Sequence, residues 1–237
     1  MKEEHADSDT LDPQTLSRLA GGLAHELKNP LSTIGLHLEI MRENWAEETN
    51  PLARRTMKTL DVLKQEVGRL NDILEDFLLY ARTENLERTP VDLNALVQKV
   101  ATFVTPEAQS QGITLDTFLD GSVPPISIDS GKIRQALLNL IINARQAMEG
   151  KGGTISVMTR FQDETVTMEV VDDGPGMDSK ISEKCLDVYF SSKKGGSGLG
   201  LPTVRRIMLA HGGELEIDSS PGHGTCVRMI FPLGGEA

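Results

Sequence analysis

The first third of the chain carries apolar residues at helical spacing in two successive runs. The gaps within each run are three and four residues, with extra fours near residues 23–31, which is typical of a coiled-coil seam. The members of the first run are Leu16, Leu19, Leu23, Leu27, Leu31, Ile34, Leu38, Met41 and Trp45. The members of the second run are Leu52, Thr56, Leu60, Leu63, Val67, Leu70, Leu74, Phe77 and Ala81. The pattern predicts two long amphipathic helices.

Each predicted helix has a start signal. Asp12 and Asn50 are good N-caps, and Pro13 and Pro51 follow them at the first helical position. Helices of about 30 residues would each be on the order of 45–50 Å long, joined by a short connection. One such hairpin has too little core to stand alone, and doubling it into a four-helix bundle solves this, so we expect a homodimer.

The pattern changes near residues 88–90, where the heptads stop and glycine becomes frequent. A further helix is expected to begin at Asp92, and short alternating segments read as strands. The expected strands lie near 113–115, 155–161, 166–170, 214–218 and 225–231, and the expected helices near 130–149 and 199–211. We therefore expect an α+β chain in which a two-layer α/β sandwich follows the hairpin. Its parts would be a flexible lead-in (1–12), the hairpin (13–87) and the second domain (88–237).

Composition excludes several classes of protein. The 237 residues carry a formal charge of -11 and few aromatic side chains, which argues against nucleic-acid binding. The longest apolar runs, such as 137–142, are far shorter than the roughly 20 residues that span a bilayer. The N-terminus is polar, without a signal peptide, and Cys185 and Cys226 lie in separate segments without metal-ligand spacing. We expect a cytoplasmic protein with reduced cysteines.

One histidine of the first helix has chemically useful neighbours. His25 falls off the apolar seam, and Glu26 beside it can accept a proton from one ring nitrogen, which makes the other more nucleophilic. Asn29 lies one turn further on the same face. Pro30 removes a backbone donor and clashes with the carbonyl of Glu26, so the helix is distorted here, although an incidental kink is the plainer interpretation.

The stretch AHELKNPLSTI resembles the H-box of sensor histidine kinases, in which a dimerisation helix carries the phosphorylated histidine. The resemblance implies that His25 is the phosphoacceptor, Glu26 its activating base and Asn29 a helper in dephosphorylation. His5 and His37 lack such neighbours and are expected to face solvent. The surrounding sequence is most similar to soluble sensor kinases of the nitrogen-regulation type.

Four clusters in the second half suit a nucleotide. Asn139 and Asn143 lie one helical turn apart, and neutral oxygen ligands suit Mg²⁺ that bridges phosphates. Residues 172–176 join carboxylates to glycines, and the glycine-rich residues 195–200 open a helix, as phosphate cradles do. Residues 221–225 form a turn between strands. Taken singly, each cluster could be a polar helix face, a flexible loop or an ordinary turn.

In this order the clusters resemble the N box and glycine boxes of the histidine-kinase ATP-binding domain, a Bergerat-type fold shared with gyrase and heat-shock chaperone ATPases. The resemblance implies that Asn143 binds Mg²⁺ directly with support from Asn139, and that Asp172 accepts the adenine amino group. The ATP-binding residues that we expect are Asn139, Asn143, Asp172, Gly174, Gly176, Lys193, Gly196, Gly198, Leu199, Gly200 and Thr225.

Two departures from the family pattern concern the segment over the phosphates and its charge. Leu186 and Val188 stand where an aromatic residue and a proline are usual, which puts the ordering of the lid in doubt. Gln146 replaces a frequent basic residue, so the candidates to supply positive charge are Arg145, Lys193 and Lys194.

The function that the resemblance implies is ATP-dependent autophosphorylation on His25, then transfer to an aspartate of a response regulator, with possible phosphatase activity on that regulator. The expected cofactors are ATP and Mg²⁺. The expected partners are a second copy, a response-regulator receiver domain and an upstream sensor outside this chain. The alternatives are an ATPase of the same fold and a pseudokinase scaffold, neither of which would transfer a phosphoryl group to histidine.

Overall fold

The computed structural model describes residues 13–46, 51–81, 86–193 and 196–233, with the backbone alone for 13–25 and 79–81. The expected lead-in, the caps Asp12 and Asn50, and His5 lie outside the described residues. The chain divides into two compact units, Met1–Glu84 and Asn85–Ala237, which we call the hairpin unit and the sheet unit. The boundary that we expected was after residue 87.

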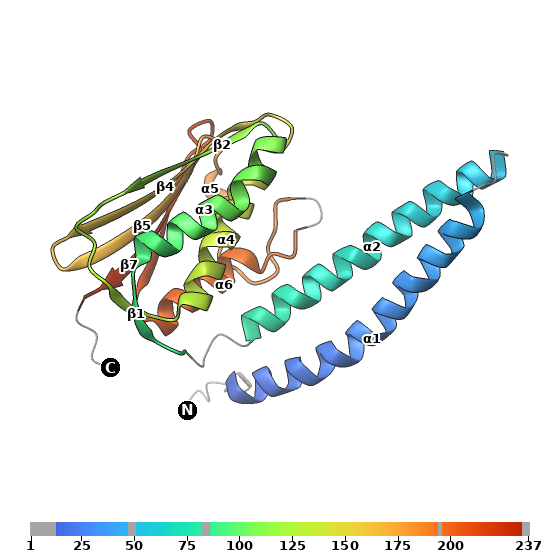
Figure 1. The fold of residues 1–237 in the computed structure, drawn as a ribbon, viewed down its shortest axis with the longest axis horizontal. Coiled ribbons are helices and arrows are strands. Elements are labelled where there is room, and N and C mark those ends of the chain that lie inside the picture. Colours follow the sequence, from blue (N-terminus) through green and yellow to red (C-terminus); the bar gives the residue numbers. More distant parts are fainter. Residues whose placement is uncertain (1–12, 47–50, 82–85, 194–195, 234–237) are drawn as a thin grey trace, which may run out of the picture. The chain divides into compact units, whose positions relative to one another are not determined.

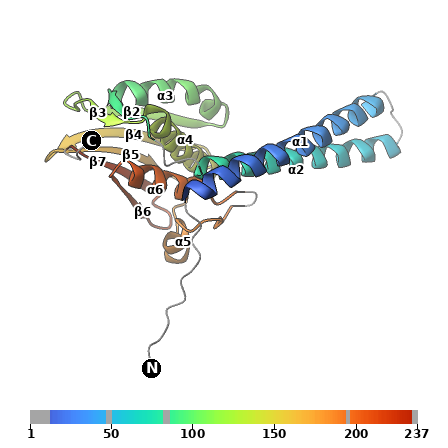
Figure 2. The ribbon, with the colours of Figure 1, turned by 90° about the horizontal axis from the view of Figure 1, so that it is seen from below.

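The hairpin unit consists of two long helices that lie side by side (Figure 2). They are α1 (Pro13–Ala46) and α2 (Pro51–Ala81), and both begin at the prolines that the sequence indicates. Pro30 lies inside α1 without ending it. No helix of the described residues is both long enough and apolar enough to cross a membrane.

The contact between the two helices buries part of the predicted seam. Leu38, Leu60 and Leu74 are buried, whereas several other seam residues keep about half of their surface exposed. At the start of α2, Leu52 is 64% exposed within one hairpin, and its neighbour Ala53 is fully buried.

The sheet unit joins two sheets and four helices. Its strands are β1 (Thr89–Val91), β2 (Ile113–Leu119), β3 (Ile126–Ile128), β4 (Gly153–Gln162), β5 (Thr165–Asp172), β6 (Glu214–Ser219) and β7 (Thr225–Pro232). Its helices are α3 (Leu93–Ser110), α4 (Ser130–Ala147), α5 (Ser179–Lys184) and α6 (Gly200–Ala210). The strands β1 and β3 and the helix α5 were not predicted from the sequence, because each is too short to show a period.

The main sheet has five strands in the order β2-β4-β5-β7-β6, and β1 pairs with β3 in a small second sheet. β2 runs parallel to β4, and the other neighbours in the main sheet are antiparallel. The helices α3, α4 and α6 pack on one face of this sheet (Figure 1). The expected two-layer α/β sandwich is confirmed.

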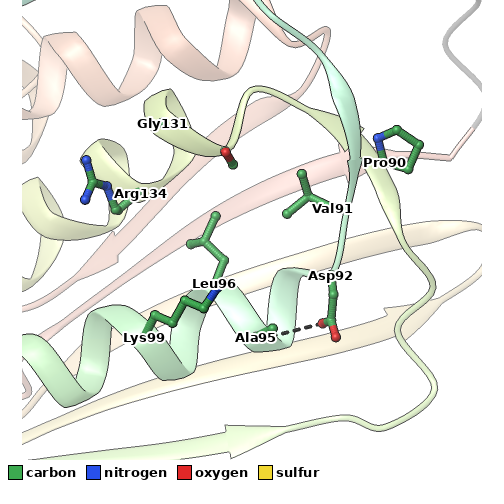
Figure 3. Close-up of a pocket in the computed structure, with 9 residues that line it drawn as sticks. Pro90, Val91, Asp92, Ala95, Leu96, Lys99, Gly131 and Arg134 are labelled. Carbon is green, nitrogen blue, oxygen red and sulfur yellow. Dashed lines mark hydrogen bonds between the residues drawn. The ribbon is translucent and has the colours of Figure 1, made fainter.

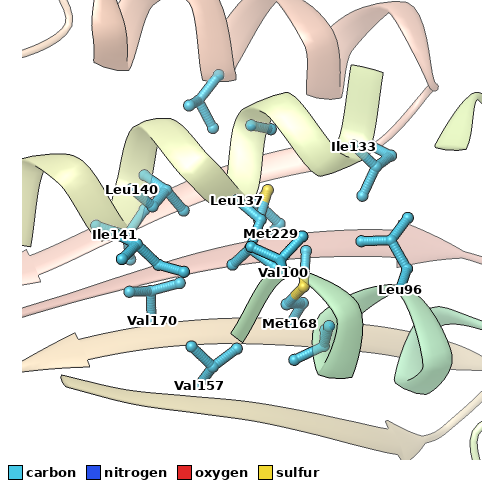
Figure 4. Close-up of a cluster of buried hydrophobic side chains, with 14 of the residues drawn as sticks. Leu96, Val100, Ile133, Leu137, Leu140, Ile141, Val157, Met168, Val170 and Met229 are labelled. Carbon is cyan, nitrogen blue, oxygen red and sulfur yellow. The ribbon is translucent and has the colours of Figure 1, made fainter. Parts of the chain in front are cut away.

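The core lies between the helices and every second residue of the strands (Figure 4). On β5, Val166, Met168 and Val170 are buried, while the residues between them are half-buried on the other face. Leu137 of α4 is also fully buried. Alternation on the strands and a 3.6-residue period on the helices are therefore both satisfied by one apolar layer. This layer holds the ends of β5 and α4, where the predicted nucleotide residues lie.

Candidate nucleotide and phosphoacceptor sites

Asp172 ends β5 with a carboxylate that is held by backbone donors. Its side chain is 8% exposed, and Oδ1 accepts a hydrogen bond from the backbone N–H of Gly174 at 3.0 Å. Burial raises the pKa of the Asp172 carboxyl, and hydrogen bonds from the backbone of Gly174 and Thr225 oppose the rise. The group is thus fixed in orientation before any ligand arrives, which favours specific recognition of a hydrogen-bond donor.

The loop after β5 packs against the turn between β6 and β7. The backbone N–H of Gly222 donates to the carbonyl of Pro175 at 2.7 Å. The hydroxyl of Ser219 accepts from the backbone N–H of Met177 at 2.9 Å and donates to the carbonyl of Gly224 at 2.9 Å. Two of the predicted glycine clusters therefore form one unit around Ser219, a residue that the sequence analysis missed.

Gly224 meets the strand end that carries Asp172. Its φ is +76°, and a Cβ placed there would overlap the carbonyl oxygen of Asp172. A side chain at this position would both strain the backbone and push the carboxylate out of place. The glycine is therefore needed for close packing beneath Asp172.

The other wall of the site is the C-terminal half of α4. Asn139 and Asn143 are both half-buried on one face of this helix, as predicted. Gly200, the first residue of α6, lies against the Asn143 amide: a Cβ on Gly200 would come 3.3 Å from Nδ2. The amide thus faces the N-terminus of a helix, where backbone N–H groups and the helix dipole favour phosphate.

Lys193 connects the segment before α6 to this wall. Its Nζ donates to the backbone carbonyl of Asn143 at 2.7 Å. Burial lowers the pKa of Lys193, and the nearby Asp172 carboxylate opposes that shift. Of the three predicted sources of positive charge, the structure places Lys193 at the site.

Arg145, the second candidate, does not supply that charge. Arg145 forms an ion pair with Glu107 of α3, so its guanidinium faces the neighbouring helix instead. The sequence could not show this, because Arg145 and Asn143 are close in sequence but lie on different faces of α4. Lys194 lies outside the described residues.

The segment before α6 contains the predicted glycines Gly196 and Gly198 and ends at Leu199. The backbone N–H of Tyr189 donates to the carbonyl of Gly198 at 3.1 Å, and Gly196 lies against Ser191. Leu199 is fully buried and accepts a hydrogen bond at its carbonyl from the Thr203 hydroxyl at 2.6 Å. Leu199, which we predicted to bind ATP, therefore anchors the start of α6.

Two residues at the edge of the site were not predicted. Met148 is 1% exposed at the end of α4, and a Cβ on Gly174 would come 3.2 Å from its Cγ. Asp173 points to the start of β4, where Oδ1 accepts from the backbone N–H of Thr154 at 2.8 Å. The two adjacent carboxylates thus have different tasks, which the Asp-Asp-Gly pattern alone does not reveal.

The donor set fits a magnesium ion that arrives with phosphates. Within the described residues, no three His, Cys, Asp or Glu side chains are grouped to hold a metal. The Asn143 side chain makes no hydrogen bond in this same part of the chain, so its amide oxygen remains available. Mg²⁺ takes few protein ligands and completes its shell with water and phosphate oxygens. The Asn143 amide oxygen, beside a helix N-terminus that favours phosphate, could be such a protein ligand.

The second predicted site lies on the hairpin unit, inside α1. The His25 side chain lies outside the described residues; the side chains of Glu26 and Asn29 are exposed. The Asn29 carbonyl accepts from the Thr33 hydroxyl at 3.0 Å. Lys28 forms an ion pair with Glu75 of α2 at 2.9 Å, so the two helices are adjacent at this level. His37 is exposed, as predicted.

Comparison with known proteins assigns a family to each unit. Residues 128–235 match the model of the histidine kinase-, DNA gyrase B- and HSP90-like ATPases. Residues 15–86 match the His Kinase A phospho-acceptor domain. Together the two matches give the chain the pair of domains that forms a sensor histidine-kinase catalytic core.

The relatives are longer proteins. The chain is 31% identical over 92% of its length to the signal transduction histidine-protein kinase AtoS of Escherichia coli, and 34% identical over 93% to the sensor histidine kinase ZraS of Klebsiella oxytoca. It spans 35% of AtoS and 47% of ZraS.

Solved structures share the fold. Full-length ShkA in complex with AMPPNP superposes with a TM-score of 0.73 at 26% identity, covering 93% of this chain and 47% of ShkA. The histidine kinase ThkA in complex with the response regulator TrrA gives a TM-score of 0.65 at 25% identity, covering 93% of this chain and 63% of ThkA.

Proposed function

We propose that the chain is the catalytic core of an ATP-dependent protein-histidine kinase that phosphorylates His25 and then an aspartate of a response regulator. The observation that carries the proposal is the grouping of Asp172, Asn143 and Lys193 at one end of the main sheet. The other unit carries the His25-containing motif, which supplies a phosphoryl acceptor. The ShkA complex with AMPPNP, an analogue of ATP, supports this assignment.

In the sheet unit, the fixed carboxylate of Asp172 would accept the adenine amino group, and the start of α6 would receive the phosphates. Lys193 would move from the Asn143 carbonyl to a phosphate oxygen, because the ammonium gains more from an anion than from a neutral carbonyl. Asn143, with Asn139 one turn away, would hold Mg²⁺, which would neutralise charge on the phosphates when bound. Residues of the chain thus orient the nucleotide, and little covalent chemistry is left to them.

At the hairpin unit, an imidazole nitrogen of His25 would attack the γ-phosphorus of ATP. The bond from phosphorus to the bridging oxygen breaks, ADP leaves, and Glu26 takes the proton of the second ring nitrogen. In the next step the phosphorus–nitrogen bond breaks and an aspartate oxygen of the response regulator takes the phosphoryl group. Asn29, exposed one turn from His25, would orient water in the reverse reaction on the regulator.

The hairpin would function as a homodimer. Leu27, Ile34, Leu63 and Leu70 are 46–51% exposed within one hairpin although they belong to the predicted seam. A second hairpin would bury them in a four-helix bundle. Because the proposed reaction consumes ATP, we also propose that this core functions in the cytoplasm.

The test is incubation of the chain with γ-labelled ATP and Mg²⁺, with His25→Gln and His37→Gln compared side by side. Both histidines lie on α1, and His37 is exposed, so His37→Gln is a matched control. We expect label that is acid-labile and base-stable in the wild type and in His37→Gln, and none in His25→Gln. Equal labelling of the two variants would refute the assignment of His25 as the phosphoacceptor. ATP hydrolysis without any labelling of the protein would favour an ATPase that does not phosphorylate histidine.

A further inference from the structure

A groove separates the N-terminal halves of α3 and α4 (Figure 3). It encloses about 490 Å³ and is lined from β1, α3 and α4. Val91 and Leu96 form its apolar part, and the Leu96 side chain points into the space between the two helices. We call it the α3–α4 groove. It lies far from the nucleotide site: Gly131 at its edge is about 18 Å from Asn143 along α4, at 1.5 Å per residue.

Two cations face this groove without a partner. Lys99 comes from α3 and Arg134 from α4, and both are exposed. Neither makes a hydrogen bond or an ion pair with any residue that the structure describes. Further along the same two helices, Arg145 of α4 does pair with a carboxylate, that of Glu107 of α3. What sets Lys99 and Arg134 apart is that both face the same groove, one from each helix, where a ligand with carboxylates could contact both.

The carboxylates nearest the groove are already used by the helix ends. Asp92 caps α3 by accepting from the backbone N–H of Ala95 at 3.0 Å. Asp129 caps α4 by accepting from the backbone N–H of Lys132 at 3.0 Å, and its second oxygen accepts from the N–H of Glu87 at 3.1 Å. These acids neutralise helix termini rather than Lys99 and Arg134, so the groove presents positive charge.

An exposed aromatic residue extends the apolar surface. Phe103 follows Lys99 by one turn on the same face of α3 and is 76% exposed, the highest value among the large hydrophobic side chains that the structure describes. This side chain is therefore not part of the hydrophobic core. Aromatic residues are enriched in protein–protein interfaces, so Phe103 could contribute to one.

The walls of the groove are formed before binding. Besides the two caps, the imidazole Nε2 of His211 accepts from the backbone N–H of Asp129 at 3.0 Å, which holds the start of α4 against α6. Arg88 donates to the carbonyl of Ala210 at 2.6 Å and fixes the segment that leads into β1. A preformed groove loses little entropy when it is filled.

We propose that the α3–α4 groove binds a segment of a partner protein that places an apolar side chain on Leu96 and Val91 and carboxylates on Lys99 and Arg134. Phe103 would pack against the same segment. The opposite charges would steer its approach, and the apolar contact would supply most of the affinity. This site is separate from the nucleotide pocket and from His25, so it does not depend on the proposed kinase activity.

The probe is a random 12-residue peptide display library selected on the whole chain, with the double variant Lys99→Glu/Arg134→Glu used to remove peptides that bind elsewhere. Because both side chains are exposed and unpaired, this variant should fold, and its melting curve checks that. We expect the selected peptides to combine Asp or Glu with Leu, Ile or Phe. Synthetic copies should bind the wild type at least tenfold tighter than the double variant, and Phe103→Ala should weaken them severalfold.

The matched control reverses two other exposed cations of the sheet unit, Lys151→Glu/Arg160→Glu, and should leave peptide affinity unchanged. Excess ATP with Mg²⁺ should not displace the peptides. The proposal is overturned if no peptide prefers the wild type, if the preferred peptides lack acidic residues, if the control reversal weakens them equally, or if ATP displaces them.

Discussion

Replacing Asp172 by Asn isolates the contribution of one carboxylate to nucleotide recognition. The substitution keeps the size of the side chain, and the Asn oxygen can still accept from the Gly174 N–H that Oδ1 now holds at 3.0 Å. What changes is the second oxygen, which becomes an NH₂ group that opposes the adenine amino group donor to donor. The site is 8% exposed, so water cannot replace the lost partner.

The magnitude follows from the cost of an unmade hydrogen bond to a charged group, about 1.5–3 kcal/mol in a buried place. This corresponds to a loss of roughly 10- to 150-fold in ATP affinity. Isothermal titration of the wild type and Asp172→Asn with ATP and Mg²⁺ measures it. Adenosine should lose a similar factor, because the phosphates do not take part in this contact.

The adjacent carboxylate provides the control. Asp173 bonds the N–H of Thr154 rather than facing the ligand, so Asp173→Asn should leave ATP affinity within a fewfold. If Asp172→Asn binds ATP as tightly as the wild type while remaining folded, the adenine contact is refuted. If both variants weaken binding equally, the loss is a general disturbance of the loop.

Three further outcomes are expected. Gly224→Ala should lower the free energy of unfolding in urea by about 2 kcal/mol or more, whereas Gly222→Ala, also at positive φ but with open space around it, should cost only about 1 kcal/mol. Burial lowers the pKa of His211, so the folded state binds fewer protons than the unfolded state. The stability that neutral His211 contributes should be fully present above the ordinary pKa of 6.5 and should decline as the pH falls towards the lowered pKa of the folded state. Urea unfolding curves of His211→Gln should lack this pH dependence. Asn29→Ala should keep labelling from ATP within a fewfold yet slow the decay of phosphorylated regulator, and equal decay rates would limit Asn29 to a structural role.

The sequence predicts the long elements well because their signals repeat. Pro13 and Pro51 mark the starts of α1 and α2, and the apolar period runs through both helices. The period did not indicate that Ala53, next to Leu52, is fully buried within one hairpin. β1 and β3 have three residues each and exist only because they pair with one another. No local pattern can indicate such a pairing.

The residues of the candidate site likewise divide into those with a local sequence signal and those without one. Asn143 and Asp172 each stand in a local motif that can be found in the sequence, and the resemblance to the histidine-kinase ATP-binding domain implied that they share one site. Ser219 could not be found in this way, because its partners Met177 and Gly224 belong to loops that meet only in the fold. The ion pair of Arg145 with Glu107 depends likewise on which helix packs beside α4.

The hydroxyl of Ser219 has a consequence for chimeras between histidine kinases. Because it holds both the loop after β5 and the turn before β7, those two segments cannot be exchanged independently, although they lie far apart in the gene. A recombinant that takes one segment from a relative and keeps the other would place a foreign loop against Ser219 and Gly224. A single crossover between residues 178 and 218 would therefore give poorly folded products, because it always takes this loop and the β6–β7 turn from different parents.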